Sequence, residues 1–409
     1  MTAWLNERPD MIQVTYRVLS DKLIDPEKKA RMIALGQTTG AWTPTLAPGI
    51  KKLEALRGHV LGVDERTHVE GRPYEYYLTI GYPLLLTEND LPSLLTLVFG
   101  RLSLEGKIRL VGMQLPDKFL KQKGPRHGIE GIRALTGEPK QPLQMATLKP
   151  CLGLTPHELG ALFYQLALSG MHIIKDDDIL IDLPGCSTEK RLEVCLKSSE
   201  KAAQATGKKA LYAVNLTGKP AEIISKAQRL AKQGATCFLF NVLSYGYGLL
   251  EEVREVNVPI MTYPGLAGAV AGGTDTGIAY NVLLGLLMRA GGADISLFPS
   301  SYGPTAAPHD EVLAVKEALT RPMGGIKRAF PVPSAGITPG LTLRLVRDYG
   351  RDVIINTDDV VYAHPQGLRA GVRAFRQAIR WAESHKDFAG LSGTLFPELS
   401  TALSLWGRG

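Results

Sequence analysis

The segment IIKDDD, at residues 173–178, is a short apolar run that ends in one lysine and three consecutive carboxylates. An apolar run of this length predicts a buried strand, so the charged cluster is expected where that strand ends, at the rim of a core. Alternation along the strand points Lys175 and Asp177 to one face and Asp176 to the other, with Asp178 at the end. Adjacent carboxylates repel one another and need either Lys/Arg partners or a divalent cation with oxygen ligands. A solvated acidic turn is the alternative.

From residue 143 onward, short apolar segments alternate with segments of helical periodicity. The expected strands lie at 143–149, 172–177, 210–216, 237–242, 259–263, 293–298, 329–332 and 353–356. The expected helices lie near 156–169, 188–205, 219–233, 247–255, 275–290, 309–319, 339–348 and 368–383. Eight such units in about 270 residues match the count and length of a TIM (β/α)8 barrel. A doubly wound open sheet is the alternative, but no GxGxxG motif follows an expected strand, which argues against a dinucleotide-binding domain.

The first part of the chain has a different order of elements. Strands are expected at 12–19, 58–64, 74–82 and 107–116, and helices at 25–33 and 91–99. This order predicts a ferredoxin-like α+β domain, with helices on one face of an antiparallel sheet. The charged segment 118–137 is the expected linker. We therefore expect a ferredoxin-like domain at 1–122 and the barrel at 123–409, with an apolar helical extension at 391–406.

The composition is that of an ordinary globular enzyme. The 409 residues are 44% hydrophobic, and no segment approaches the roughly 18 apolar residues of a membrane span. The N-terminus lacks the basic and apolar regions of a secretory signal, so we expect a cytoplasmic protein. The net charge of +7 is spread over separate segments without interleaved aromatic residues, which argues against nucleic acid as a partner. The four cysteines and eight histidines lack the spacings of disulfide frameworks and zinc sites.

Polar residues follow the expected barrel strands where each strand ends. In a TIM barrel the chemistry lies at these C-terminal strand ends. In chain order they are Lys149, Lys175 with Asp177 and Asp178, Asn215, Asn241, Tyr263, residues 300–303, residues 334–336 and residues 357–359. Two lysines and several carboxylates at one rim predict a metal site beside a cation that polarises a carbonyl group.

Several segments resemble one known family. The segments TLKP at 147–150, LGL at 152–154 and GMHIIKDDD at 170–178 are similar to the barrel signature of the RuBisCO large-chain superfamily. Further similar segments lie at 40–43, 99–100, 124–129, 333–336 and 364–365. The segments LYAVNLTG at 211–218, SLFPSSYG at 296–303 and FPVPSAG at 330–336 most resemble the RuBisCO-like proteins (form IV) of methionine salvage. Those proteins enolise 2,3-diketo-5-methylthiopentyl 1-phosphate, so the resemblance implies a Mg²⁺-dependent enolase or isomerase.

The resemblance also implies roles for the charged residues of the central segment. Lys175 is similar to the lysine that reacts with CO2 to form a carbamate, and Asp177 and Asp178 resemble its companion Mg²⁺ ligands. A carbamate converts a cation into an oxygen donor, so three anionic groups would face one hard cation. Lys149 resembles the lysine beside the enolate of the substrate, which stabilises charge or carries a proton and whose pKa the metal is expected to lower. An ordinary salt bridge is the alternative role for Lys149.

Some positions depart from the family pattern. Carboxylating members have a lysine in the loop after the sixth barrel strand, but residues 300–308 contain none, so we do not expect CO2 fixation. Those members also have a second lysine where this chain has Cys151. The proton-abstracting lysine of the salvage enolases is Arg101 here, and arginine can orient an anion but is a poor base. Relatives have phosphate-binding glycines where this chain has Asp358 and Asp359, whose carboxylates would repel a phosphate.

We therefore predict Lys149 and Arg101 as catalytic residues, with Mg²⁺ and a CO2-derived carbamate on Lys175 as cofactors. The predicted substrate-binding residues are Trp42, Asn215, Tyr263, Ser334, Gly336, Asp358 and Asp359. Family members pair head to tail, so the resemblance implies a homodimer in which Trp42 and Arg101 enter the site of the partner. Two alternatives stay open, namely an isomerase or decarboxylase with a different ketose or sugar-acid substrate, and a non-catalytic homologue that binds a metal or ligand.

Overall fold

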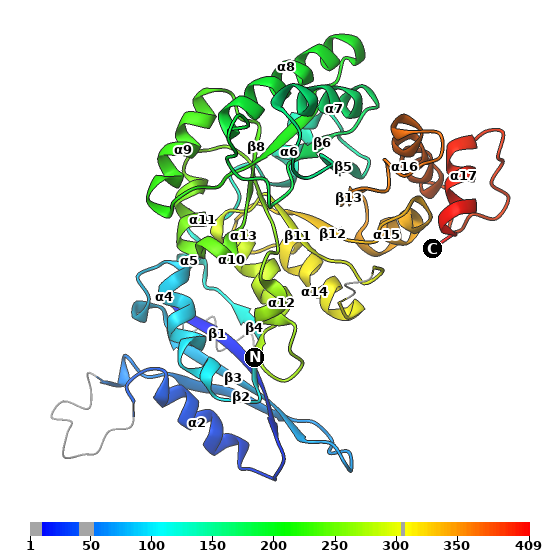
Figure 1. Ribbon diagram of the computed structural model, residues 1–409. Helices are drawn as coiled ribbons and strands as arrows, with labels where there is room; N and C mark the ends of the chain where they lie inside the picture. The colour runs from blue at the N-terminus through cyan, green and yellow to red at the C-terminus, as the bar shows by residue number, and fades with distance from the viewer. Residues whose placement is uncertain (1–9, 41–52, 304–306) are drawn as a thin grey trace.

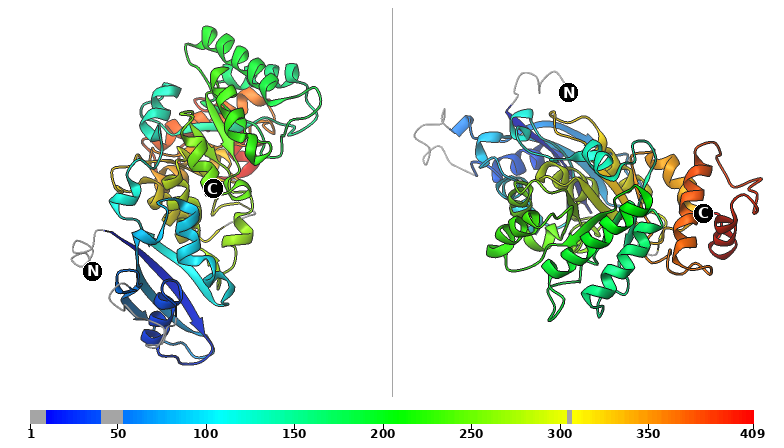
Figure 2. Two further views of the ribbon diagram at one scale, coloured as in Figure 1. Left: turned by 90° about the vertical axis from the view of Figure 1, so that its left-hand side faces the viewer. Right: turned by 90° about the horizontal axis from the view of Figure 1, so that it is seen from above.

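The computed structural model describes residues 10–40, 53–303 and 307–409 of the chain. A mostly antiparallel N-terminal sheet with its helices stands beside an eight-stranded parallel barrel (Figure 1). Seen from above, the N-terminal domain and the C-terminal helices lie on opposite sides of the barrel (Figure 2). No helix within these described ranges is long and apolar enough to cross a membrane.

The N-terminal sheet has the ferredoxin-like order that the sequence predicts. Its strands are β1 (Met11–Ser20), β2 (His59–Glu65), β3 (Tyr74–Pro83) and β4 (Ile108–Gln114), which pair antiparallel in the order β4-β1-β3-β2. Its helices are α2 (Pro26–Gly36), α4 (Leu91–Leu95) and the π-helix η3 (Thr96–Gly100), with short 3-10 turns η2 (Leu84–Leu86) and η4 (Leu102–Leu104). Helix α2 begins as expected, because the Asp25 carboxylate accepts the N–H of Lys28 at 2.9 Å and Pro26 occupies the first turn.

The barrel contains all eight expected strands, so the TIM-barrel prediction is confirmed. They are β5 (Leu143–Thr147), β6 (Ile173–Lys175), β7 (Leu211–Asn215), β8 (Cys237–Phe240), β9 (Ile260–Thr262), β11 (Ile295–Pro299), β12 (Phe330–Ser334) and β13 (Ile354–Asn356). Parallel ladders join them from β13 through β5 and round to β12. The two ends of the sheet meet where the amide of Asn356 donates a hydrogen bond to Ser334 Oγ at 3.2 Å.

The barrel helices alternate with these strands. They are α7 (Pro156–Leu168), α8 (Thr188–Thr206), α9 (Pro220–Lys232), α10 (Val242–Tyr245), α11 (Tyr247–Arg254), α12 (Ala267–Ala271), η5 (Asn281–Leu286), α13 (Leu287–Gly291), α14 (His309–Thr320), η6 (Pro339–Leu341), α15 (Thr342–Tyr349) and α16 (Leu368–Ala382). Helix α7 illustrates how a capping sequence sets the first residue of a barrel helix. Its N-cap Thr155 and Glu158 exchange hydrogen bonds in a capping box, which satisfies two backbone N–H groups at the helix start.

Residues 118–137, expected as a linker, contain two helices, α5 (Asp117–Leu120) and α6 (Gly128–Thr136). Ile129 and Ile132 of α6 are fully buried in one cluster with Leu143 and Met145 of β5 and with inward side chains of the other strands. Helix α6 therefore closes one end of the barrel. The charge and the Gly-Pro pair of this segment suggested a linker, but two isoleucines three residues apart already form the buried face of a helical turn.

The predicted helix at 275–290 is wrong at its start. Residues Gly277–Ile278 form strand β10, which pairs in parallel with β4 and adds a fifth strand to the N-terminal sheet. The same junction contains a partly buried ion pair, in which Arg109 of β4 holds Glu311 of α14 through two hydrogen bonds of 3.0 Å. The barrel thus contributes both a strand and a carboxylate to the N-terminal domain.

The expected C-terminal extension is helix α17 (Pro397–Trp406), which packs on α16. Leu399 and Leu403 lie in a separate apolar cluster with Trp381 of α16 and with Phe388. A second contact comes from Gln377 of α16, whose amide oxygen accepts the backbone N–H of Leu399 at 2.8 Å. The extension therefore covers the outer face of one barrel helix (Figure 1).

Candidate active site

Lys149, Cys151 and Asp177 form a compact triangle at the C-terminal end of the barrel strands. Lys149 follows β5 and Asp177 follows β6, and these strands pair in parallel with Thr147 opposite Lys175. Lys149 Nζ donates hydrogen bonds to Asp177 Oδ2 at 3.2 Å and to Cys151 Sγ at 3.1 Å. Cys151 Sγ donates to the same carboxylate oxygen at 3.0 Å. Parallel pairing of neighbouring strands therefore brings the predicted catalytic lysine onto a predicted metal ligand.

The contacts in this triangle shift the pKa values of Lys149 and Asp177 in the directions that favour their charged forms. Burial acts to lower the pKa of Lys149, but the hydrogen bonds with Cys151 and Asp177 and the charge of Asp358 raise it above its ordinary value. Burial acts to raise the pKa of Asp177, but hydrogen bonds from Cys151, the N–H of Ile179 and Lys149 lower it to about 2. These neighbours shift the pKa of Lys149 upward, opposite to the lowering that the resemblance implies for a metal beside it.

Lys175 is the last residue of β6 and is only 3% exposed. Its Nζ donates a hydrogen bond to the backbone carbonyl of Asp176 at 3.2 Å and lies 5.6 Å from the centre of the Tyr263 ring. Burial lowers the pKa of Lys175, although the negative charges of Asp358, Asp177 and Asp178 oppose the shift. A lowered pKa increases the fraction of uncharged amine, which is the nucleophilic form of a lysine.

Asp178 has a different environment from Asp177. Burial and the charge of Asp177 raise the pKa of Asp178, against a hydrogen bond from the Tyr263 hydroxyl and the charge of Lys175. The same surroundings raise the pKa of Tyr263, through burial first and then through Asp178. Two adjacent carboxylates that repel each other beside a buried lysine form a group of oxygen donors whose repulsion a cation would relieve.

Asp176 lies on the opposite face of the strand, as the alternation predicts. It is fully buried, and its carboxylate accepts the Tyr212 hydroxyl at 2.6 Å, the Asn215 N–H at 3.0 Å and Arg191 Nε at 3.4 Å. Burial raises the pKa of Asp176, while Arg191, Tyr212 and the Asn215 N–H oppose the shift. Asp176 is therefore an anchor for the strand end that carries the two candidate metal ligands.

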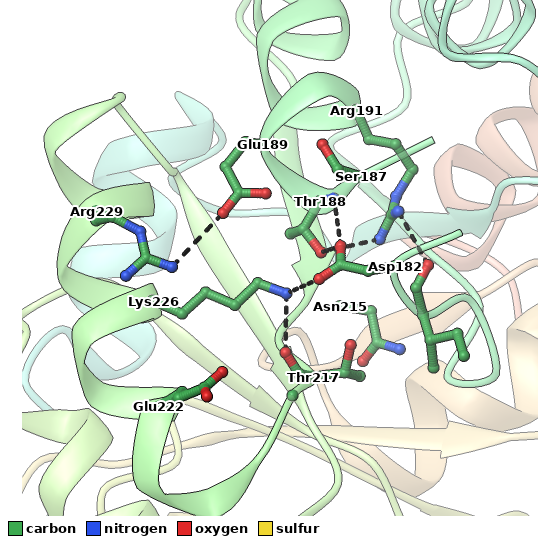
Figure 3. A network of polar contacts seen from close by, with 12 residues as sticks. Asp182, Ser187, Thr188, Glu189, Arg191, Asn215, Thr217, Glu222, Lys226 and Arg229 are labelled. Atoms are coloured by element: carbon green, nitrogen blue, oxygen red, sulfur yellow. Dashed lines mark hydrogen bonds and ion pairs between the residues drawn. The ribbon is translucent and has the colours of Figure 1, made fainter. Parts of the chain in front are cut away.

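A network of polar contacts holds the segment that follows the metal ligands, residues 179–188 (Figure 3). Arg191 of α8 is fully buried, and its guanidinium donates to the carbonyls of Cys186 at 2.7 Å and Ile181 at 3.2 Å. Lys226 of α9 is 5% exposed, and its Nζ donates to Asp182 Oδ2 at 2.5 Å and to the Thr217 carbonyl at 2.8 Å. Two buried cations from neighbouring helices therefore fix this loop.

The sequence alone did not identify Arg191, Tyr212 or Lys226 as part of the site. A signal existed for Arg191, because it occupies the same buried stripe of α8 as Cys195 and Ala202, at helical spacing. An arginine on an apolar stripe requires a buried acceptor, and Asp176 was predicted to lie on the face of the strand opposite Lys175 and Asp177.

Asn215, predicted to bind substrate, lies at the end of β7. Its amide nitrogen donates to the carbonyls of Asp178 at 2.8 Å and Leu180 at 3.1 Å. Its amide oxygen is buried and has no partner among the described residues. The amide nitrogen of Asn215 is thus used to position the loop, and only the oxygen is free.

The other predicted binding residues lie on the last two strands and on the N-terminal domain. Ser334 ends β12, where its Oγ contacts the Val332 carbonyl at 3.1 Å, and Gly336 has a left-handed φ of 71°. Asp358 also has a positive φ, of 41°, and its charge acts on both Lys149 and Lys175, whereas Asp359 is exposed. Arg101 is exposed at the end of η3 and makes no ion pair in the part of the chain that the structure describes. Trp42 lies outside the described residues.

The donor set around Lys175 fits a magnesium ion only if the lysine is modified. Among the described residues, no group of three or more His, Cys, Asp and Glu side chains is placed to hold a metal ion. Asp177 and Asp178 supply two carboxylates, and Lys175 is the third side chain of the group. Addition of CO2 to its amine would give a third anionic oxygen donor, which is the ligand type that Mg²⁺ prefers. The residues therefore fit both proposed cofactors together.

Comparisons with known proteins agree with this fold. Family models of the ribulose bisphosphate carboxylase large chain match the chain, the N-terminal domain over residues 3–119 and the catalytic domain over residues 128–298. A 2,3-diketo-5-methylthiopentyl-1-phosphate enolase of Microcystis aeruginosa is 39% identical over 389 residues, which cover 94% of this chain and 97% of that protein. An enolase of the same name from Bacillus licheniformis is 40% identical over 401 residues, covering 96% and 97%.

Solved structures agree as well. A RuBisCO-like protein (MtnW) from Alicyclobacillus acidocaldarius superposes with a TM-score of 0.89 at 36% identity, covering 97% of this chain and 100% of that one. The octameric ribulose-1,5-bisphosphate carboxylase/oxygenase of Pyrococcus horikoshii superposes with a TM-score of 0.88 at 27% identity, covering 98% and 94%. With both domains matched and relatives about 40% identical over nearly the whole chain, this protein belongs to the RuBisCO large-chain family.

Proposed function

We propose that this protein enolises 2,3-diketo-5-methylthiopentyl 1-phosphate, the substrate named for its curated relatives. The observation that carries the proposal is the contact between Lys149 and Asp177 beside the buried amine of Lys175. This arrangement combines a fixed positive charge with oxygen donors for a cation, and both stabilise the negative charge of an enediolate. We propose no carboxylation step, because residues 300–308 contain no lysine.

We propose that Lys175 is carbamylated and that its carbamate, Asp177 and Asp178 hold Mg²⁺. The uncharged amine attacks the carbon of CO2. A C–N bond forms while one C=O π bond breaks and its electron pair moves to oxygen, and one proton passes from the nitrogen to water. Burial favours this reaction because it lowers the pKa of Lys175 and so supplies the uncharged amine. When bound, Mg²⁺ supplies a Lewis acid for the vicinal oxygens of the substrate.

Two residues of the chain are proposed to stabilise charge, transfer a proton and orient the substrate. The Lys149 ammonium, held by Asp177, stabilises negative charge on the substrate oxygen and can give up a proton to it. We propose that the neutral amine formed in this way takes the C-1 proton, so that Lys149 ends the reaction in its original protonation state. Because arginine is a poor general base, we propose that Arg101 orients the anionic part of the substrate and does not abstract the proton.

One observation favours a second candidate, an enolase whose substrate lacks a phosphate at the β13 end. Asp358 occupies a left-handed backbone position there, and its charge acts on Lys149 and Lys175. A carboxylate at this place attracts a cationic or hydroxylated group more readily than a phosphate. The replacement Asp358→Gly distinguishes the candidates, because it improves kcat/KM for the phosphorylated substrate only if the carboxylate opposes that phosphate.

Exchange of the C-1 proton tests the proposed reaction. Incubation of 2,3-diketo-5-methylthiopentyl 1-phosphate in D2O with enzyme, Mg²⁺ and bicarbonate is expected to give loss of the C-1 proton signal by NMR. Omission of bicarbonate or addition of EDTA is expected to suppress the exchange, because the proposed ligand set needs both cofactors. Exchange at the uncatalysed rate in the complete mixture would exclude this substrate.

We further propose a homodimer with shared active sites, in which Arg101 of one subunit serves the barrel of its partner. Support comes from the exposure of Arg101 and its lack of ion pairs in the described ranges of its own chain. Mixed dimers of Lys149→Met and Arg101→Ala chains would contain one intact site each. Co-refolding the two inactive variants is therefore expected to restore about a quarter of the wild-type activity. Activity at the level of the separate variants would show that each site uses a single chain.

A further inference from the structure

Cys151 belongs to the triangle with Lys149 and Asp177, but the proposed function gives it no role. It lies two residues after Lys149, in the loop that follows β5, and is partly buried. Its Sγ accepts a hydrogen bond from Lys149 Nζ at 3.1 Å and donates one to Asp177 Oδ2 at 3.0 Å. A thiol can do both at once, because its S–H is a donor and its sulfur is an acceptor. Cys151 therefore bridges the proposed catalytic lysine and a proposed metal ligand.

The contacts of Lys149 leave one of its N–H groups free. An ammonium group has three N–H donors. Lys149 Nζ donates to Asp177 Oδ2 at 3.2 Å and to Cys151 Sγ at 3.1 Å, and no further hydrogen bond of this nitrogen lies within the described ranges. Because the four bonds of the nitrogen are tetrahedral, two fixed N–H groups determine the direction of the third. The third N–H is the one left for the substrate.

The same two acceptors also orient the uncharged form of Lys149. A neutral amine has two N–H groups and one lone pair. When both N–H groups stay on Asp177 and Cys151, the lone pair takes the place of the third N–H. With Asp177 as the only acceptor, the amine is free to rotate about its Cε–Nζ bond and to turn the lone pair away from the substrate. The orientation of a reacting group affects the rate because the reacting atoms must be aligned and close.

The bridge does not use all the acceptor positions of Asp177. Each oxygen of a carboxylate has two lone-pair positions. Asp177 Oδ2 accepts Lys149 and Cys151, whereas Oδ1 accepts the backbone N–H of Ile179 at 3.3 Å and has no second donor in the part of the chain that the structure describes. Asp177 can therefore hold Cys151 and still serve as a ligand.

We propose that Cys151 is a positioning residue that fixes the direction in which Lys149 exchanges protons with the substrate. The inference rests on the proposed function, in which Lys149 gives a proton to the substrate oxygen and takes the C-1 proton. Both transfers take place in one region of the substrate, because enolisation removes the proton from the carbon next to the carbonyl group. Cys151 acts through Lys149 and itself gains or loses no proton.

Steady-state kinetics of wild type, Cys151→Ala and Cys151→Ser with the diketone phosphate, Mg²⁺ and bicarbonate tests the proposal. Cys151→Ala is expected to lower kcat at least about tenfold and to change KM by less than about twofold, because it misorients only the group that transfers the proton. The isotope effect on kcat with C-1 deuterated substrate is expected to increase, because proton transfer becomes slower relative to the other steps. Cys151→Ser keeps a donor and an acceptor, so its kcat is expected to stay within about threefold of wild type.

Cys237→Ala is the matched control. Cys237 is fully buried and is the first residue of β8, at the opposite end of the barrel strands from the candidate site. Its replacement removes the same sulfur atom and is expected to lower stability but to leave kcat within about twofold of wild type. Equal kcat in Cys151→Ala and Cys151→Ser would overturn the proposal.

Crystal structures without substrate test the position of Lys149 separately from the proposed function. In Cys151→Ala, Lys149 Nζ is expected to leave its wild-type position by at least about 1 Å or to lose ordered density, and in Cys151→Ser it is expected to stay in place. If wild type does not exchange the C-1 proton, the proposed function fails and these structures alone decide the role of Cys151. An unchanged Lys149 side chain in Cys151→Ala would then contradict that role.

Discussion

Lys149→Met is expected to lower kcat for enolisation by about 10³-fold with little change in KM. The Lys149 ammonium lies 3.2 Å from Asp177 Oδ2, and its raised pKa keeps it charged at the working pH. Its positive charge therefore acts mainly on the negative charge that develops on the substrate oxygen in the transition state. Methionine keeps most of the side-chain volume and removes the charge. Steady-state kinetics with the diketone phosphate measures the effect.

The matched control is Lys190→Met. Lys190 is 55% exposed on α8 and, among the residues that the structure describes, pairs only with Glu193, so its replacement is expected to leave kcat within twofold of wild type. A Lys149→Met enzyme that retains more than a tenth of the wild-type kcat would assign Lys149 to an ordinary salt bridge with Asp177. A protein that only binds ligands would show no turnover in either variant, and Lys149→Met would then change affinity alone.

Arg191→Met is expected to reduce the free energy of unfolding by about 3–5 kcal/mol, because it leaves the Asp176 carboxylate buried without its counter-charge. The guanidinium also holds the carbonyls of Ile181 and Cys186. The loop after Asp178 is therefore expected to loosen, and Mg²⁺ affinity to fall with stability. Urea unfolding and Mg²⁺ titration in bicarbonate buffer measure the two effects.

The loss of folding stability in Arg191→Met is expected to become smaller as the pH falls. Burial already raises the pKa of Asp176, and loss of Arg191 removes the largest opposing influence. The folded variant then binds the Asp176 proton more tightly than the unfolded chain does, so its stability rises as pH falls from 7 to 5. The double variant Arg191→Met/Asp176→Asn is expected to recover part of the loss at pH 7.

Arg229→Met is the control for this experiment. Arg229 lies on α9 in the same region (Figure 3), but it is 58% exposed and its nearest carboxylate, on Glu189, is 3.8 Å away. Its replacement is expected to change stability by less than about 0.5 kcal/mol. Equal losses in Arg191→Met and Arg229→Met would contradict the role of Asp176 as a buried anchor.

The elements of the barrel could be read from the sequence because each carries its own local signal. Short apolar runs such as 143–147 and 173–175 form strands buried on both faces, and segments such as 156–168 carry capping residues and helical periodicity. Local signals failed where a distant partner decided the outcome. Gly277–Ile278 forms a strand because it pairs with the edge of β4 that β1 does not cover. Helix α6 is buried because Ile129 and Ile132 pack against the inward side chains at one end of the barrel.

The candidate site shows the same division. The segment IIKDDD by itself predicted a buried strand, with Lys175 and Asp177 on one face and Asp176 on the other. Only the tertiary structure decided that Asp177 meets Lys149 and that Arg191 neutralises Asp176, because both contacts join segments that parallel strand pairing and helix packing bring together. Local periodicity sets the elements, whereas a charge buried in a core takes whichever partner the packed fold places beside it.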